Sequence, residues 1–393
     1  MPYIQNTPSD VQAMLKAAGV GSLDELFASI PAHLKLNRPL DLPPALSELE
    51  LLGHVSDLAR RNRHLDECVS FLGAGVYDHF IPAVVDQLAS RSEFYTSYTP
   101  YQPEVSQGVL QVFFEYQTLI CQLTGMDVSN ASMYDGASAL AEAVLMACHI
   151  ASPGAKRRAL VPRTLHPEYR HVLRTYMKHF ELELVEIGYE DGIIRLDELE
   201  RECKSGAACV VVQNPNFFGC VEPVRRISAV AKQAGALLVA CVDPISLGIL
   251  EAPGAYGADI VVGDGQPLGN HPSFGGPHFG FMACRQEFVR KMPGRIVGET
   301  VDHDGRRGFV LTLQTREQHI RREKATSNIC TSMALCALRG TVYLAALGKL
   351  GLRRVAELCL QKSHYLRDEI AKLPGFKPRF TAPFFKEFAV ACP

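Results

Sequence analysis

The sequence lacks an excess of charge of either sign. It contains 40 Lys and Arg residues against 42 Asp and Glu residues, which gives a formal net charge of −2 and a pI near 6.7. It also lacks a run of the roughly 20 apolar residues that cross a bilayer, and its first residues show no basic stretch followed by an apolar core. We therefore expect no nucleic-acid partner, no membrane partner and no signal peptide.

Paired or clustered cysteines are missing as well. The 12 cysteines are scattered singly, several of them inside apolar runs, and no CxxC pair occurs. A structural zinc site needs clustered Cys and His ligands, whereas disulfide frameworks are typical of oxidising compartments. The pattern predicts reduced thiols, no metal site and a cytoplasmic protein.

The first 65 residues are rich in helix-start signals. Thr7 precedes a proline and an aspartate, and the stretches 22–25 and 47–50 both match the Ser-x-x-Glu capping box. Pro-rich chain lies between these signals. The pattern predicts a helical arm over residues 1–65 rather than an independent core.

From residue 66 to residue 325, helical periodicity alternates with short continuous apolar runs. Such runs between helices favour a mostly parallel sheet that is covered on both faces, and the run 279–284 is predicted to be an antiparallel strand. Residues 326–393 are predicted to form helices and part of a small C-terminal domain that stops within an element. The fold class is therefore α/β, with a large domain and a smaller satellite.

Polar residues stand where the predicted strands end. Asn214, Asp243 and Gln266 follow three apolar runs, and Gly136-Ala137-Ser138 opens an Ala-rich helix. In open parallel sheets, ligands bind beyond the carboxyl ends of the strands. The sequence therefore predicts a site at this edge of the sheet.

This arrangement resembles the large domain of fold-type I pyridoxal-phosphate (PLP) enzymes, the aspartate aminotransferase-like fold. The resemblance implies that Gly136, Ala137 and Ser138 take the phosphate-binding turn at a helix N-terminus. It places Asn214 near the ring hydroxyl and Asp243 opposite the pyridinium nitrogen. Each feature also has a simpler interpretation, as a helix start or a turn former, and we expect these residues to be vestiges.

The lysine of such enzymes is missing. Between Lys232 and Lys291 there is no lysine, and the strand exit that should carry it reads Gln266-Pro267. Because an amide nitrogen cannot form an imine, the chain cannot hold PLP covalently at that place.

Two long motifs suggest a family. Residues 95–108, YTSYTPYQPEVSQG, and residues 314–331, QTREQHIRREKATSNICT, closely resemble stretches of the glycine cleavage system P-protein. That family has either one chain of two similar halves or two separate subunits, and this sequence is similar to the first half. The resemblance implies a heterotetramer with a PLP-bearing second subunit, inactivity of this chain alone, glycine as substrate, and transfer of its aminomethyl carbon to the lipoyl arm of H-protein.

In that assembly, we expect the chain to supply one wall of its partner's site. Tyr95, Tyr98 and Thr99 are predicted to face substrate or cofactor, although tyrosines are also common in plain interfaces. The loop at residues 273–277 is predicted to offer backbone N–H groups of Ser273, Gly275 and Gly276 to the partner's PLP phosphate.

Two other interpretations stay open. The chain could be a non-catalytic scaffold of the same fold, or a self-sufficient PLP enzyme with a displaced lysine such as Lys291. The basic run at residues 316–324 fits either a solvated helix face or an interface.

Overall fold

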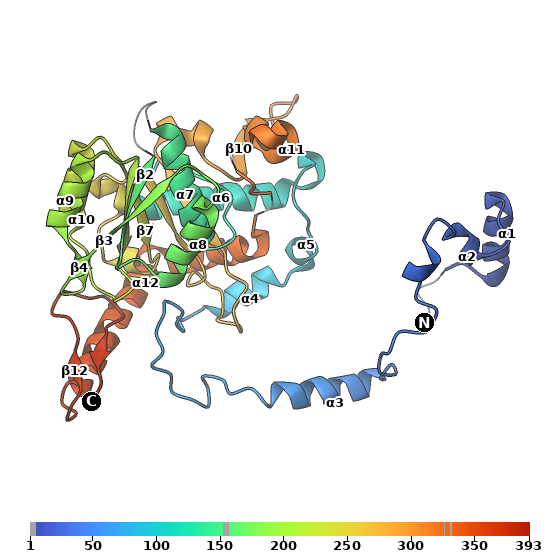
Figure 1. The fold of residues 1–393 in the computed structure, drawn as a ribbon, viewed down its shortest axis with the longest axis horizontal. Coiled ribbons are helices and arrows are strands. Elements are labelled where there is room, and N and C mark those ends of the chain that lie inside the picture. The colour runs from blue at the N-terminus through green and yellow to red at the C-terminus, as the bar shows by residue number, and fades with distance from the viewer. Residues whose placement is uncertain (1–4, 152–156, 326, 331) are drawn as a thin grey trace. The chain divides into compact units, whose positions relative to one another are not determined.

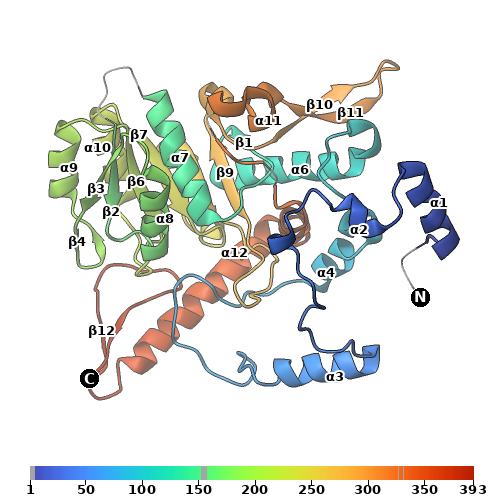
Figure 2. The same cartoon turned by 45° about the vertical axis from the view of Figure 1, so that its right-hand side comes forward.

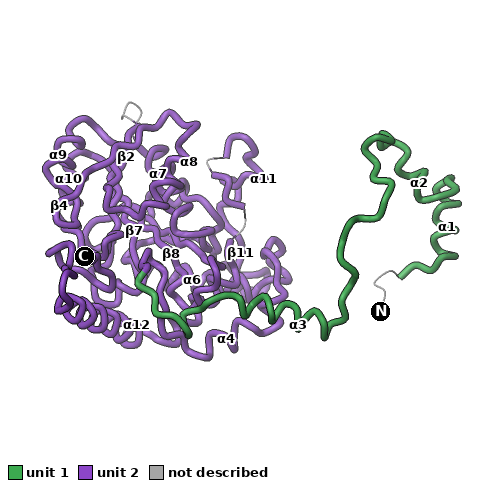
Figure 3. Tube along the Cα trace, turned by 60° about the horizontal axis from the view of Figure 1, so that its bottom comes forward, with its two compact units in different colours: residues 1–71 green, residues 72–393 purple. Residues whose placement is uncertain are grey.

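The structure is a computed structural model that describes residues 5–151, 157–325, 327–330 and 332–393 (Figure 1). The chain divides into two compact units, residues 1–71 and residues 72–393 (Figure 3). The domain boundaries expected after residues 65 and 325 stay predictions.

The first unit contains the expected short helices: α1 (Pro8–Ala18), α2 (Leu23–Leu26), the 3-10 helix η1 (Ala32–Leu34) and α3 (Glu48–Ala59). Helix α1 begins after the predicted N-cap Thr7, which also forms a capping box with Asp10, and α3 begins with the capping box predicted at Ser47. The capping box predicted at Ser22 is wrong, because the Ser22 hydroxyl donates to the carboxylate of Glu25 at 3.4 Å instead of accepting a backbone N–H.

A seven-stranded sheet forms the centre of the second unit, in the order β1-β9-β8-β7-β6-β2-β3. Strands β8, β7, β6, β2 and β3 run parallel, and β9 pairs antiparallel with β8 and β1, which confirms the prediction for residues 279–284. The strands are β1 (Val128–Ser129), β2 (Arg158–Pro162), β3 (Glu183–Ile187), β6 (Cys209–Asn214), β7 (Leu237–Val242), β8 (Ile260–Asp264) and β9 (Gly280–Cys284).

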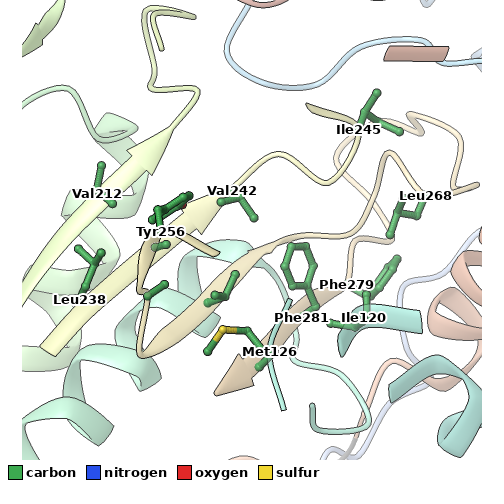
Figure 4. Close-up of a cluster of buried hydrophobic side chains, with 14 of the residues drawn as sticks. Ile120, Met126, Val212, Leu238, Val242, Ile245, Tyr256, Leu268, Phe279 and Phe281 are labelled. Carbon is green, nitrogen blue, oxygen red and sulfur yellow. The ribbon is translucent and has the colours of Figure 1, made fainter. Parts of the chain in front are cut away.

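Helices cover both faces of this sheet, as the continuous apolar runs predicted (Figure 2). One face packs against α7 (Gly136–Ile150) and α8 (Pro167–Met177), and the other against α6 (Gln107–Thr124), α9 (Leu196–Lys204), α10 (Val224–Gln233) and α12 (Ala334–Ile370). Successive strand residues point to opposite faces. Val212, Leu238 and Val242 therefore share one core with Phe279 and Phe281 (Figure 4).

Some elements differ from the sequence pattern. A hairpin of β10 (Ile296–Val301) and β11 (Arg307–Thr312) was not predicted. The basic run at residues 316–324, for which a helix face was one interpretation, contains the short helix α11 (Gln318–Arg321), between the 3-10 turns η6 (Gln314–Arg316) and η7 (Arg322–Lys324).

The two helices expected near the end of the chain form α12, which is interrupted at Gly348, where φ is 58°. By length and composition α12 could cross a bilayer, but its buried residues belong to the core of the second unit. The shorter elements are α4 (Ala83–Ala89), α5 (Ser92–Tyr95), η2 (Pro103–Val105), β4 (Tyr189–Glu190), β5 (Ile193–Ile194), η3 (Ser246–Gly248), η4 (Pro253–Tyr256), η5 (Gln286–Lys291), β12 (Lys377–Pro378) and β13 (Val390–Ala391).

Candidate functional site

A cavity of about 250 Å³ lies at the carboxyl edge of the sheet, where the strand exits were predicted to meet. Residues after β6, β7 and β8 line it together with the first turn of α7, and residues 74–76 and 385–387 close it from outside the sheet. Parallel strands place their carboxyl ends at one edge, so the topology itself creates this site.

The small-residue turn opens α7 as predicted, but its N–H groups are already bonded to carboxylates. Gly136 donates its N–H to Oδ2 of Asp264 at 3.1 Å, and Ser138 donates its N–H to Oδ1 of Asp135 at 2.7 Å. Ala137, which lines the cavity, lies between them. A phosphate at this helix end would meet two negative charges, so the turn does not fit the phosphate of PLP.

Asp264 also organises the neighbouring side chain of His278. The Nδ1 atom of His278 lies 3.1 Å from Oδ1 of Asp264, and this hydrogen bond raises the pKa of His278 above its ordinary value. The Asp264 carboxylate therefore favours the protonated form of His278, whose positive charge counters the acidic end of the cavity.

Asp243 follows β7 at the predicted place, but the chain itself provides its cation. Lys386 forms an ion pair with Asp243, and the two side chains are only 8% and 19% exposed. Burial alone would raise the pKa of Asp243, but the Lys386 ammonium and the N–H of Ile245 at 2.8 Å hold it below its ordinary value. The ammonium of Lys386 therefore sits on the carboxylate that would face a pyridinium nitrogen.

A neutral histidine completes the surroundings of Lys386. The Nε2 atom of His79 lies 3.2 Å from the Lys386 ammonium, and burial with the nearby Lys386 charge lowers the pKa of His79 to about 4. His79 therefore accepts from the lysine near neutral pH and adds no charge.

Gln266 and Asn214 take part in the turns where they occur. The side chain of Gln266 is 2% exposed and donates to the carbonyl of Asn270 at 2.5 Å. The side-chain oxygen of Asn214 accepts the N–H of Glu222 at 3.0 Å. Among the described residues that line the cavity, Lys386 is the one lysine, while Lys291 lies exposed in η5.

Residues 383–387, which we call the C-terminal strap, hold Lys386 in place. The N–H of Val221 donates to Pro383 at 2.7 Å, and the N–H of Phe385 donates to Gly219 at 3.1 Å. Glu387 accepts from the N–H of Gly75 at 3.1 Å and from the hydroxyl of Tyr77. The cavity therefore does not fit PLP. Gln266 stands in place of the lysine, the carboxylate of Asp264 occupies the phosphate end, and Lys386 already pairs with Asp243 at the other end.

Sequence reasoning missed Asp264, Lys386 and Glu387. Asp264 directly follows a predicted strand, and its position was a usable signal. Lys386 and Glu387 reach the cavity from a segment far along the chain, and no local pattern marks them.

The segment expected to serve a partner lies on the surface. Tyr95 ends α5 and is 67% exposed, and Tyr98 is 78% exposed, whereas Thr99 is half-buried. Side chains this accessible are free to meet another chain.

The loop at residues 273–277 is mostly exposed, with left-handed backbone at Phe274 and Gly275. The N–H of Gly276 is donated to the carbonyl of Ser273 at 2.9 Å, so it is already used within the loop. A phosphate would have to meet the other N–H groups of the loop, among them that of Gly275.

Helix α4 links these two segments. Tyr95 lines a shallow depression together with Asp86 and Arg339. Asp86 forms an ion pair with Arg339 and lies 3.4 Å from His271, just before the loop. The structure therefore brings both predicted segments to the neighbourhood of one helix.

One cluster could be taken for a metal site. Asp302, His303 and Asp304 are exposed between β10 and β11, with ligand atoms within 4.8 Å of one another. Oδ1 of Asp302 accepts the N–H groups of Asp304 and Arg306 at 2.9 and 2.8 Å. These bonds are those of an Asx turn, which explains the cluster without an ion.

Comparison with known proteins gives a consistent result. The family model described as "Glycine cleavage system P-protein" matches residues 1–391. The chain is 56% identical over 390 residues to a protein of Desulforamulus reducens named "Probable glycine dehydrogenase (decarboxylating) subunit 1", covering 99% of this chain and 87% of the relative. A protein of the same name from Chlorobium luteolum is 54% identical over 394 residues, covering 100% and 88%.

Solved structures agree. A crystal structure of glycine decarboxylase (P-protein) of the glycine cleavage system, in inhibitor-bound form, superposes with a TM-score of 0.92 at 51% identity, covering 100% of this chain and 88% of that one. Sphingosine-1-phosphate lyase of Burkholderia pseudomallei, at 13% identity, shares the fold with a TM-score of 0.65 over 92% of this chain and 82% of that one. The architecture is that of the fold-type I PLP enzymes, and the chain belongs to the glycine cleavage system P-protein family.

Proposed function

We propose that this chain is the lysine-less subunit of a decarboxylating glycine dehydrogenase and is inactive alone. The observation that carries the proposal is the replacement of the lysine by Gln266 in a cavity whose two ends are filled by Asp264 and Lys386. The name "subunit 1" of its relatives supports the same assignment. PLP and its chemistry then belong to the sister chain.

The partners follow from this assignment. A PLP-bearing second subunit completes a heterotetramer, glycine is the substrate, and lipoylated H-protein receives the aminomethyl group. We place the complex in the cytoplasm, because the 12 cysteines of this chain are unpaired and most are at least partly buried.

The chain contributes side chains and backbone to the sister's site. Tyr95, Tyr98 and Thr99 orient the substrate and exclude water, and the loop at residues 273–277 offers the N–H groups of Ser273 and Gly275 to the phosphate, while that of Gly276 closes the loop on Ser273. The exposure of Tyr95 and Tyr98 and the position of both segments beside α4 support this role.

The first experiment tests where PLP is held. The isolated chain and the complex with its sister are incubated with PLP, reduced with borohydride and mapped by mass spectrometry. We expect reducible PLP on the sister chain alone. A visible imine absorbance and glycine turnover by this chain in isolation would contradict the proposal and favour a displaced lysine.

The second experiment tests whether the chain supplies residues to the sister's active site, which we call the half-site, or is a non-catalytic scaffold. In the assembled complex, Tyr98→Phe is expected to lower kcat/KM for glycine by about tenfold or more, the effect of losing one hydrogen bond to a charged group. Gly276→Val should cause a similar loss by straining the loop, because φ at Gly276 is 154°. Tyr365→Phe is the matched control, since Tyr365 is also a mostly exposed tyrosine, on α12, at 68% against 78% for Tyr98. Unchanged kinetics in both site variants would favour the scaffold.

A further inference from the structure

The two motifs that suggested the family meet at one buried arginine. Arg295 precedes β10, and its side chain is 3% exposed. Its Nη2 donates to the hydroxyl of Tyr101 at 2.9 Å, and its guanidinium carbon lies 4.9 Å from the centre of the Tyr101 ring. On the other side, its Nε lies 3.9 Å from Oε2 of Glu317, whose side chain is 6% exposed. Arg295 thus touches residues 95–108 and residues 314–331 at once.

Core stability alone does not explain this arrangement. Among the described residues, Nε and Nη1 of Arg295 and Oε1 of Glu317 have no hydrogen-bond partner. A buried ion pair with poor geometry is often less stable than apolar residues of the same size. What Arg295 adds over an apolar residue is direction, through the hydrogen bond to Tyr101 and the cation–π contact.

The backbone of Arg295 is fixed from both sides. Ala131 donates its N–H to the carbonyl of Arg295 at 2.8 Å. The preceding turn is held by Asn130, which donates to Pro293 at 3.0 Å, and by Arg316, which donates to Gly294 at 2.9 Å. The guanidinium of Arg295 therefore projects from a rigid support that includes the second motif.

Tyr101 is the anchor of the exposed segment. Within residues 95–101, all of them described, it is the one side chain for which the structure gives a hydrogen bond to a distant element. Its N–H also donates to the carbonyl of Thr99 at 2.8 Å, which links the anchor to Thr99 and thus to Tyr98 beside it. Loss of the Arg295 contact would leave this segment with local bonds.

We propose that Arg295 is a positioning residue for the reaction of the assembled enzyme. It fixes Tyr101, and through it Tyr98 and Thr99, and joins this segment to Glu317, so that the two motifs meet the sister chain as one surface. This inference rests on the proposed function. It identifies Arg295 as the residue that holds the half-site segment around Tyr101 rigid.

The contact is tested first in the isolated chain, by the rate of chymotrypsin cleavage after Tyr98. Arg295→Lys and Tyr101→Phe are expected to speed cleavage about tenfold, because cleavage follows the open population and one charged hydrogen bond is lost. Arg307→Lys is the matched control. Arg307 begins β11, which pairs with the strand that follows Arg295. It lies over the Phe309 ring at 5.0 Å and is paired with Glu299, but it is mostly exposed.

Turnover is measured next in the complex with the sister chain. Arg295→Lys and Tyr101→Phe are each expected to lower kcat about tenfold with PLP content and subunit association unchanged. The double variant should be no worse than either single variant, because both remove one contact. If Arg295→Lys does not fold, Tyr101→Phe still removes the same hydrogen bond, from the more exposed side, and can be measured in its place.

Three results would overturn the inference: additive losses in the double variant, an equal loss in Arg307→Lys, or faster proteolysis with unchanged kcat. In the last case Tyr98→Phe separates the two proposals. If Tyr98→Phe still loses activity, only the role of Arg295 fails. If it does not, the proposed half-site fails as well.

Discussion

Replacing Lys386 by methionine removes the ammonium but keeps the length and most of the volume of the side chain. Asp243 then keeps the hydrogen bond from the N–H of Ile245, in a place where its side chain is 19% exposed. The variant tests how much the ion pair of Lys386 with Asp243 stabilises the second unit.

The magnitude can be worked out in two ways. Removing one partner of a buried ion pair costs about 3–5 kcal/mol of unfolding free energy. If Asp243 takes up a proton instead, raising its pKa from the ordinary 3.8 to neutral pH costs about 4 kcal/mol, at about 1.4 kcal/mol per pH unit. Both routes give the same size of effect, so Lys386→Met should destabilise the second unit by about 4 kcal/mol at pH 7.

The pH dependence has a defined sign. The pKa of Asp243 is depressed in the folded chain, so the stability from the pair is fully present above 3.8 and is lost as the pH falls through the folded pKa. The difference between wild type and Lys386→Met should therefore shrink as the pH approaches that range.

Urea unfolding of the isolated chain, followed by circular dichroism, measures the effect. Asp243→Asn alone should also destabilise, whereas the double variant with Lys386→Met should recover most of the loss, because no charge is then left unpaired. Lys372→Met is the control, since Lys372 pairs with Glu369 at the surface. Additive losses, or a Lys386→Met variant as stable as the control, would refute the reasoning.

Two further predictions concern the same unit. Burial raises the pKa of Glu142 to about 7 from 4.5, so the contribution of this carboxyl to stability should fall by about 3 kcal/mol as the pH rises from 4.5 to 7. Glu142→Gln should remove this part of the pH dependence, whereas Glu115→Gln, on the surface of α6, should leave it unchanged. Gly219 has φ of 81°, and a Cβ there would lie 1.9 Å from the carbonyl oxygen of Glu387. Gly219→Ala should therefore displace the strap and lower the melting temperature far more than Gly235→Ala, which has φ of 66° and open space around it.

Local patterns predicted much of the fold. The apolar runs located the central strands. Gly125 and Gly19, which end α6 and α1, have the left-handed backbone that favours glycine at a helix end. The strand exits at Asn214 and Asp243 were placed correctly because a strand that ends in a polar residue is visible within a few positions of sequence.

Contacts between distant segments could not be predicted in this way. The ion pair of Lys386 with Asp243 depends on how the strap crosses the sheet edge, and the bond of Arg295 to Tyr101 depends on the unpredicted hairpin. Strands β10 and β11 have mixed apolar and polar residues that match no simple period. A local pattern can also mislead. Residues 22–25 match a capping box, but the Glu25 carboxylate accepts from the N–H of Gly21 and the hydroxyl of Ser22 instead.

The ion pair of Lys386 with Asp243 has a consequence for how the subunit folds. A ligand stabilises a fold by mass action, in proportion to the logarithm of its concentration over its dissociation constant. A lysine that is part of the polypeptide is present at any PLP concentration, so under the proposed function this chain folds without the coenzyme before it meets its sister subunit. Its melting temperature should stay constant across a PLP titration, while that of the sister rises.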